Sequence, residues 1–379
     1  MDSRSGLRPA PRAPTGLDRR LGILDRLHRL WCERHRNRAA GEGGEALRPV
    51  FERHVRELRA LAGRPGSASR SGLDADALCA LADEDRSGRL TAGHLGALAR
   101  RIPDFDPPLP GPERVAAAAA EAASSEEHPV LRAARSFLET SRAMGGGEPP
   151  APHLRPLPWA LASLSLLRAG YPPLAADRRI GGRLEEALAA PEALPALAEV
   201  VADLATAELR ARLSGPAGVV PPQAEPPLVG PLAAAMHRRV HRHLRHRTGP
   251  IGLVLREVEP GARVSVSAAD TADGAVRERC AGAAERALFT PGPECRWVRL
   301  ELCAAEREVE LLVTVHDVGD PPSGALAVTA GPADVLDAAC TDCVTLLPGD
   351  SADERWPAVE AFVDDAVSRV LDRLTRSLA

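Results

Sequence analysis

A proline-rich segment, SGPAGVVPPQAEPPLVGP at 214–231, separates two parts of the chain that differ in hydrophobic period. Before it, apolar residues recur every three or four positions, which is the spacing of an amphipathic helix. After it, several stretches alternate between apolar and polar residues, as half-buried strands do. Segments rich in proline and glycine are typical of linkers, so we predict two folding units joined at 214–231.

The first unit is predicted to be all helical, over residues 16–213. Aromatic residues make up only 3% of the chain, so its core must consist of Leu, Ala and Val, a composition that favours helices. Helices are expected near 17–38, 46–62, 129–143, 158–170 and 191–213, with another that begins near residue 180. Residues 1–15 are rich in Pro, Arg and Ser and are expected to be disordered.

The second unit is predicted to be a smaller α+β domain over 250–379, preceded by a basic helix at 232–249. Its strands are expected at 263–268, 296–302, 308–318 and 325–331, and its helices at 274–288 and 353–378.

Composition excludes several kinds of chemistry. The chain contains no lysine, and its 48 Lys/Arg residues are all arginine. A Walker-type phosphate loop, a kinase catalytic lysine and a Schiff-base lysine are therefore impossible. The net charge of -4 argues against a general polyanion binder. No secretion signal and no membrane-spanning stretch are found, and the seven scattered cysteines suggest reduced thiols. We therefore expect a cytoplasmic location and no membrane contact.

The stretch LASLSLLRAGYPPL at 161–174 resembles a helix of the Fic (Fido) family, including its Gly-Tyr-Pro-Pro exit. HPVLRAARSFLETSRA at 128–143 is similar to the helix that leads into the family's active site. Active members transfer AMP or another phosphate-containing group to protein hydroxyls. The resemblance implies an all-α Fic-like helical domain at 16–213, followed by the smaller α+β domain.

The family's catalytic pattern, H-P-F-x-D/E-G-N-G-R, is missing between those two helices. Asn37 is the only asparagine and lies far away, and the two possible registers place Met144 or Glu148 where the family has its catalytic histidine. A replacement site would use Glu148, His153 and Arg155 as acid, base and phosphate ligand, with Gly145, Gly146 and Gly147 as a backbone nest. Five prolines at 149–158 remove N–H donors and make such a cradle harder to build.

Three hypotheses follow. We favour a Fic-fold protein with a decayed transfer motif that acts as a non-catalytic binding or regulatory protein. The alternative is a divergent Fic-like enzyme, which would need ATP and Mg²⁺. The third is a helical scaffold whose resemblance to the family is coincidental.

The run HRRVHRHLRHR at 237–247 is the densest positive segment of the chain. Arg238, Arg242 and Arg245 are the candidate contacts for a partner protein with acidic character, and a solvated helix face is the simpler interpretation. His237 and His241 are spaced like metal ligands, but the intervening arginines repel a cation, and no metal is expected.

Two further patterns resemble metal-binding motifs but favour ordinary structure. DEDRSGRLTAGH at 83–94 resembles a calcium loop, but His94 replaces the closing glutamate, so a helix–turn–helix is favoured over a vestigial site. CTDC at 340–343 is interpreted as two ordinary buried thiols. Nucleic acid is not expected as a partner, because the last helix begins with the acidic sequence DSADERW.

Overall fold

The computed structural model describes residues 16–34, 126–145, 156–174, 180–214, 230–272, 274–286, 289–305, 307–320, 322–331 and 343–378, and the single positions 48, 52, 76 and 79. Before the predicted linker these ranges contain five helices: α1 (Gly16–Arg34), α6 (Pro129–Gly145), α7 (Pro156–Arg168), α8 (Ile180–Ala189) and α9 (Ala193–Ser214). The expected helices in these ranges are thus confirmed. The one expected at 46–62 lies almost entirely outside the described residues.

The second part contains a five-stranded antiparallel sheet in which each strand pairs with the next along the chain. Its strands are β1 (Arg263–Ala269), β2 (Pro291–Ala304), β3 (Arg307–Val318), β4 (Leu326–Gly331) and β5 (Cys343–Leu346). The four predicted strands are confirmed, and β5 was missed. Helices α10 (Gly230–Val258), α11 (Gly274–Arg286) and α12 (Ala352–Leu378) accompany the sheet.

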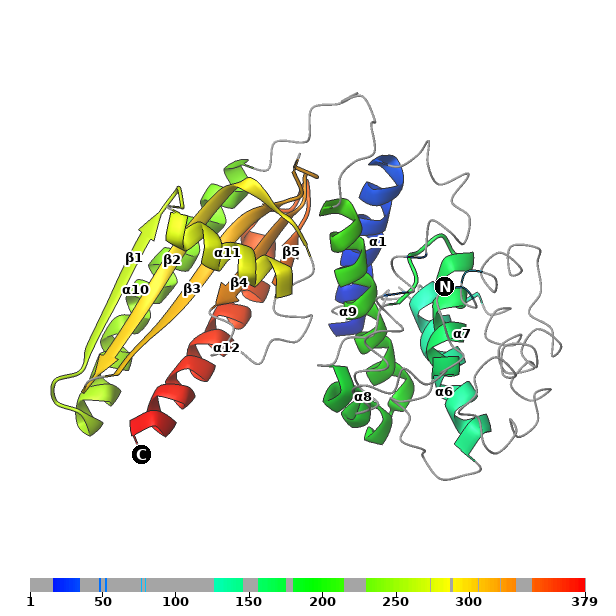
Figure 1. Ribbon diagram of the computed structural model, residues 1–379, viewed down its shortest axis with the longest axis horizontal. Coiled ribbons are helices and arrows are strands. Elements are labelled where there is room, and N and C mark those ends of the chain that lie inside the picture. Colours follow the sequence, from blue (N-terminus) through cyan, green and yellow to red (C-terminus); the bar gives the residue numbers. More distant parts are fainter. Residues whose placement is uncertain are drawn as a thin grey trace, which may run out of the picture.

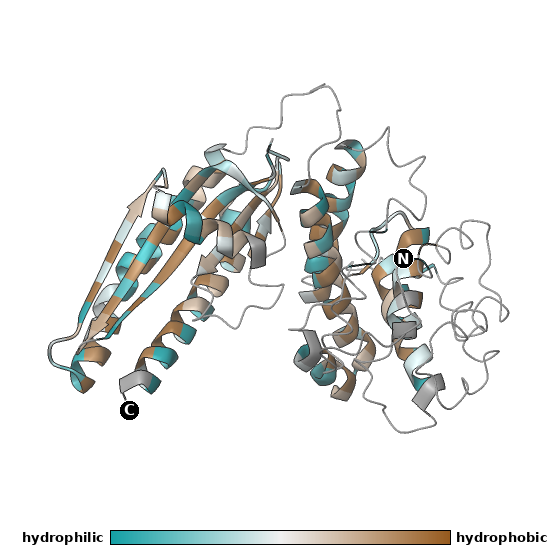
Figure 2. Cartoon of the chain, in the orientation of Figure 1, coloured by the Kyte–Doolittle hydropathy of each residue, from teal (hydrophilic) through white to brown (hydrophobic). Residues whose placement is uncertain are grey.

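The sheet is covered on both faces, as Figure 1 shows: α10 and α12 lie on one face and α11 on the other. Apolar side chains of α10, α12 and the strands, among them Val240, Leu300, Val313 and Val363, form the buried cluster on the first face. Apolar segments run along α9 and the strands in Figure 2, whereas α10 and the outer side of α12 carry many hydrophilic residues. The apolar residues that alternate along β1 and those that recur every 3.6 residues along α12 therefore pack into the same core.

The two parts of the chain meet at the end of the sheet that lies beside α1 and α9 (Figure 1). Arg26 of α1 forms an ion pair with Asp350 and donates a hydrogen bond of 2.9 Å to the Pro348 carbonyl. Arg210 of α9 donates to Oγ1 of Thr345 across 3.0 Å. The carboxylate of Asp350 is only 1% exposed, so this contact is desolvated.

The expected fold class, an all-α Fic-like helical domain followed by a smaller α+β domain, is wrong. The described residues hold eight helices together with a five-stranded antiparallel sheet, and one buried cluster joins Leu197 of α9 with Val318 and Leu347 of the sheet region. Periodicity shows that a helix has an apolar face but not what covers it, and here side chains of the sheet region help to cover the helices. The domain boundaries at 214–231 stay a prediction. Within the described ranges, no helix is both long and apolar enough to cross a membrane.

Candidate functional site

The helix that carries the LLRAGYPPL sequence ends in a glycine cap. The N–H of Tyr171 donates to the Leu166 carbonyl and that of Gly170 to the Leu167 carbonyl, the two hydrogen bonds of a Schellman motif. Gly170 has a φ of 78°, a conformation that side chains with a Cβ disfavour. Glycine at this position therefore lets the chain turn sharply and present Tyr171 to α1.

Tyr171 is an anchor between α7, α6 and α1. Its hydroxyl donates a 2.6 Å hydrogen bond to Oδ1 of Asp25, and its ring stacks on His28 with 3.9 Å between centroids. The same Asp25 oxygen accepts a 2.9 Å hydrogen bond from Nε2 of His128. Nε2 of His28 in turn lies 2.8 Å from the Gly170 carbonyl oxygen.

The hydrogen bonds and burial of this cluster shift the pKa values of Asp25 and Tyr171. Burial alone would raise the pKa of Asp25, but the hydrogen bonds from Tyr171 and His128 outweigh it and lower that pKa. Burial, and then the hydrogen bond to Asp25, raise the pKa of Tyr171 well above its usual value. His128 uses Nδ1 to accept the N–H of Val130 at the start of α6. Both ring nitrogens of His128 are engaged, so His128 holds helices together and has no free nitrogen to act as a base.

The sequence-predicted residues of the replacement site are only partly placed. Gly145 is the last residue of α6. Gly146, Gly147, Glu148, His153 and Arg155 lie outside the described residues, as do the calcium-loop-like segment 83–94 and Cys340. Their roles therefore stay predictions.

The first turn of α7 is a poor cradle for an anion. Helix N-termini bind phosphate through N–H groups that have no partner within the helix. Pro156 and Pro158 occupy the first and third positions of α7 and have no N–H. Two of the donors that this helix end would offer a phosphate are therefore missing.

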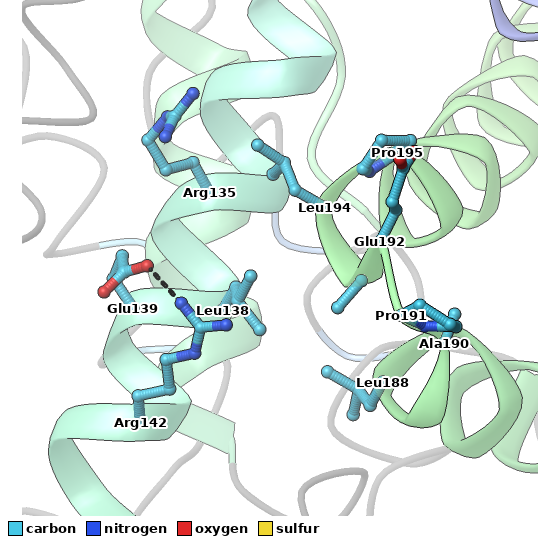
Figure 3. A pocket seen from close by; sticks show the side chains of 11 residues that line it. Arg135, Leu138, Glu139, Arg142, Leu188, Ala190, Pro191, Glu192, Leu194 and Pro195 are labelled. Atoms are coloured by element: carbon cyan, nitrogen blue, oxygen red, sulfur yellow. Dashed lines mark hydrogen bonds and ion pairs between the residues drawn. The ribbon is translucent and has the colours of Figure 1, made fainter.

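A cavity of about 450 Å³ opens between α6 and the turn that joins α8 to α9. Figure 3 shows Arg135 and Arg142 on the α6 side and Leu188 and Leu194 opposite them. Arg135 pairs with Glu127 and Arg142 with Glu139, at 2.6 and 2.9 Å. Because carboxylates neutralise both guanidinium groups, the cavity lacks the excess positive charge that a phosphate ligand would require.

Helix α10 carries the densest run of basic residues. Basic side chains on its inner side contact carboxylates of α12. Arg239 pairs with Asp353, the first-turn carboxylate of α12. Asp364 of α12 accepts from Nε2 of His243 at 2.7 Å and from Arg247 at 2.6 Å. These three basic side chains therefore join α10 to α12.

The two histidines with metal-like spacing have different surroundings. His237 is buried, with Nε2 3.0 Å from the Trp297 carbonyl oxygen and Nδ1 facing Asp270 at 3.4 Å. His241 is half-buried, and burial, followed by the charge of Arg245, lowers its pKa. Both ring nitrogens of His237 therefore face polar groups of the fold: the Trp297 carbonyl in β2 and Asp270 directly after β1.

The outer side of α10 presents Arg238, Arg242 and Arg245, the candidate partner contacts. Their spacing of four and three residues places them on one face, and all three side chains are exposed. No ion pair joins them to an acidic residue of the described ranges. We call these three residues the basic stripe.

Exposed apolar side chains follow the basic stripe at the C-terminal turns of α10. Leu253, Val254 and Val258 are 65%, 63% and 64% exposed, in contrast to the buried Ile251 and Leu255 of the same turns. The helix continues through Pro250 to Val258, beyond its predicted end at residue 249. Sequence analysis therefore missed this apolar end, because Gly249-Pro250 is typical of a helix stop.

Sequence analysis also missed a cluster on the opposite face of the sheet. Cys280 of α11, Cys295 of β2 and His316 of β3 are all buried, and their donor atoms lie within 4.8 Å of one another. Alternation in β2 and β3 indicates which face each residue takes, but nothing in the sequence places α11 over that face.

Comparison with known proteins supplies no relative: no protein-family model matches the chain, and no curated protein matches it.

Proposed function

We propose that this chain is a non-catalytic binding protein that holds an acidic partner protein on the outer face of α10. The observation that carries the proposal is the distribution of basic side chains around this helix. Arg239, His243 and Arg247 face carboxylates of α12, whereas the basic stripe has no acidic partner among the described residues. Three exposed cations on one face give a complementary surface for carboxylates with the same spacing.

The neighbouring groups favour a protein partner. Arg238 and Arg245 are seven residues apart, or about 10 Å along the helix, so carboxylates at helical spacing on a partner can reach all three arginines. The exposed Leu253, about 60° around the helix from Arg238, adds an apolar contact beyond the stripe. The acidic first turn of α12, with Asp353 and Glu354, stands near α10 and would repel a nucleic acid backbone.

Two observations support a role without catalysis. His128, which precedes the α6 helix, uses both ring nitrogens for structural hydrogen bonds. Prolines remove two of the N–H donors at the start of α7. General base catalysis and phosphate binding both depend on groups of these kinds being available.

The test is a binding measurement by fluorescence anisotropy. The probe is a labelled helical peptide that carries three glutamates at the spacing of the stripe, followed by two leucines. We expect Arg238→Glu/Arg242→Glu/Arg245→Glu to weaken binding about tenfold or more, since each exposed ion pair contributes roughly 0.2–1 kcal/mol and reversal adds repulsion.

The matched control reverses three exposed arginines on other elements: Arg29 of α1, Arg307 of β3 and Arg376 of α12. This variant has the same net charge as the stripe variant and should bind the peptide as the wild type does. Equal weakening in both variants would mean that only net charge matters, and the proposal would then be wrong.

A further inference from the structure

The sheet face under α11 contains a compact group of soft donor atoms. Cys295 of β2 and His316 of β3 are directly opposite each other in the antiparallel register. Cys280 approaches from α11, and its Sγ lies 3.2 Å from Sγ of Cys295. Around the group, Val276 and Leu312 form a small apolar cluster. The three donor residues are therefore buried together, and each comes from a different element: α11, β2 or β3.

His316 carries a nitrogen that the fold leaves unused. The side chain is 1% exposed, and Nε2 lies 2.6 Å from Oγ1 of Thr314, which itself lies 2.6 Å from Oγ1 of Thr329. Nδ1 is buried and has no hydrogen-bond partner among the described residues. An unsatisfied buried polar atom costs roughly 1–3 kcal/mol, so its presence calls for an explanation.

The protonation of His316 suits a metal ligand. Burial lowers its pKa to about 4, so the imidazole is neutral at pH 7. If Nε2 carries the proton and donates it to Thr314, the lone pair of Nδ1 is free to bind a cation. Metal-binding histidines are commonly oriented in this way by a hydrogen bond from their other nitrogen.

The spacing of the donors also suits a single ion. Zinc bonds of about 2.3 Å to sulfur and 2.0–2.1 Å to nitrogen separate neighbouring ligand atoms by roughly 3.5–4 Å. The two sulfur atoms, 3.2 Å apart, are slightly closer than this and would have to separate a little, and both lie within 4.8 Å of a ring nitrogen of His316. A disulfide between Cys280 and Cys295 would use both sulfur atoms but leave Nδ1 of His316 without a partner, whereas one metal ion satisfies all three groups.

We propose that Cys280, Cys295 and His316 bind one thiophilic d¹⁰ cation, Zn²⁺ or Cu⁺. Binding forms two metal–sulfur bonds and one metal–nitrogen bond, and the two thiols release one proton each to solvent. Zn²⁺ with two thiolates and a neutral imidazole carries no net charge, which favours it in an apolar site. Cu⁺ is satisfied by three soft ligands and needs no fourth donor.

The experiment uses the full chain, reduced and free of oxygen, with Zn²⁺ and Cu⁺ as separate probes. Each ion is titrated in competition with a chromophoric chelator of known affinity. We expect one ion per chain, and a loss of affinity of at least tenfold in Cys295→Ser and in His316→Gln. Whichever ion binds more tightly in the wild type identifies the cation.

Cys303→Ser is the matched control, because Cys303 lies on the same strand, is half-buried and stands outside the cluster. It should bind the ion as the wild type does. Cys280→Ala/Cys295→Ala keeps the site small and apolar, and its melting temperature without metal shows whether the variant folds. Added ion should raise the melting temperature of the wild type and leave that of this variant unchanged.

Binding of neither ion at one per chain would overturn the proposal. Equal affinity in the wild type and in Cys295→Ser would overturn it as well, because the ion would then sit elsewhere. A Cys280–Cys295 disulfide, found by mass spectrometry in protein purified without reductant, would contradict it if the reduced protein also fails to bind either ion.

Discussion

The hydroxyl of Tyr171 donates a 2.6 Å hydrogen bond to Asp25, a residue 146 positions earlier in the chain. This contact ties the end of α7 to the middle of α1. Since Tyr171 is the only tyrosine of the chain, its ionisation reports on this one place in the fold.

The first prediction concerns the ionisation of Tyr171. Burial and the carboxylate of Asp25 raise its pKa above the ordinary value of 10.0. The folded protein should therefore form no tyrosinate near pH 10, whereas protein unfolded in urea should form it there. The stability that Tyr171 contributes should be complete below pH 10 and should fall as the pH rises above it, because only the unfolded state then loses the proton.

Tyrosinate absorbance in the near ultraviolet measures this titration directly. Asp25→Asn removes the negative charge and should bring the pKa of Tyr171 down toward its ordinary value. Folded wild-type protein that ionises near pH 10 would show that the contact with Asp25 is absent.

The second prediction concerns the glycine cap of α7. Gly170→Ala should destabilise the protein by about 1–2 kcal/mol, because a φ of 78° strains a residue with a Cβ. The nearest atom to that Cβ would be 3.7 Å away, so crowding adds little. Gly22→Ala is the control: Gly22 lies inside α1 with open space around it, and alanine should stabilise that helix by up to about 1 kcal/mol. Urea unfolding measures both, and equal effects would contradict the cap.

The third prediction concerns the junction between the two parts of the chain. Asp350→Asn should lower the free energy of unfolding by roughly 3 kcal/mol, because it leaves Arg355, 3.4 Å away and 8% exposed, without its charge partner. Asp353→Asn breaks an ion pair whose carboxylate is 89% exposed and should cost less than about 1 kcal/mol. Similar losses in the two variants would show that Asp350 is not desolvated.

The fourth prediction concerns catalysis. Incubation with labelled ATP, Mg²⁺ and a cell lysate should transfer no label to protein, because the first turn of α7 lacks two N–H donors. Label transfer that disappears in His153→Ala would contradict a non-catalytic role and support the alternative of an enzyme.

Local features of the fold could be predicted from the sequence. The Gly-Tyr-Pro-Pro motif predicted the end of α7, and alternating apolar residues predicted β1 to β4. Strand β5 was missed because it has only four residues and begins at the last residue of the CTDC pattern. The continuation of α10 past Pro250 was missed because its cause is not local: Ile251 and Leu255 are buried in the same cluster as the sheet.

Long-range pairings could not be predicted. The helical spacing of Arg238, Arg242 and Arg245 is visible in the sequence, but the carboxylate that pairs with His243 and Arg247 belongs to Asp364, more than a hundred positions away. Cys280 and His316 likewise meet only because α11 folds over the sheet. The spacing of residues within one helix or strand does not show which distant segment will pack against it.

The most direct measurement of the proposed role compares two acidic peptides of identical composition. In one peptide, glutamates at positions i, i+4 and i+7 form a single helical face; in the other they are distributed around the helix. If the basic stripe is a docking surface, the wild-type protein should bind the aligned peptide about tenfold more tightly, and the preference should vanish in Arg238→Glu/Arg242→Glu/Arg245→Glu. Equal affinity of the wild type for both peptides would contradict a partner site on α10.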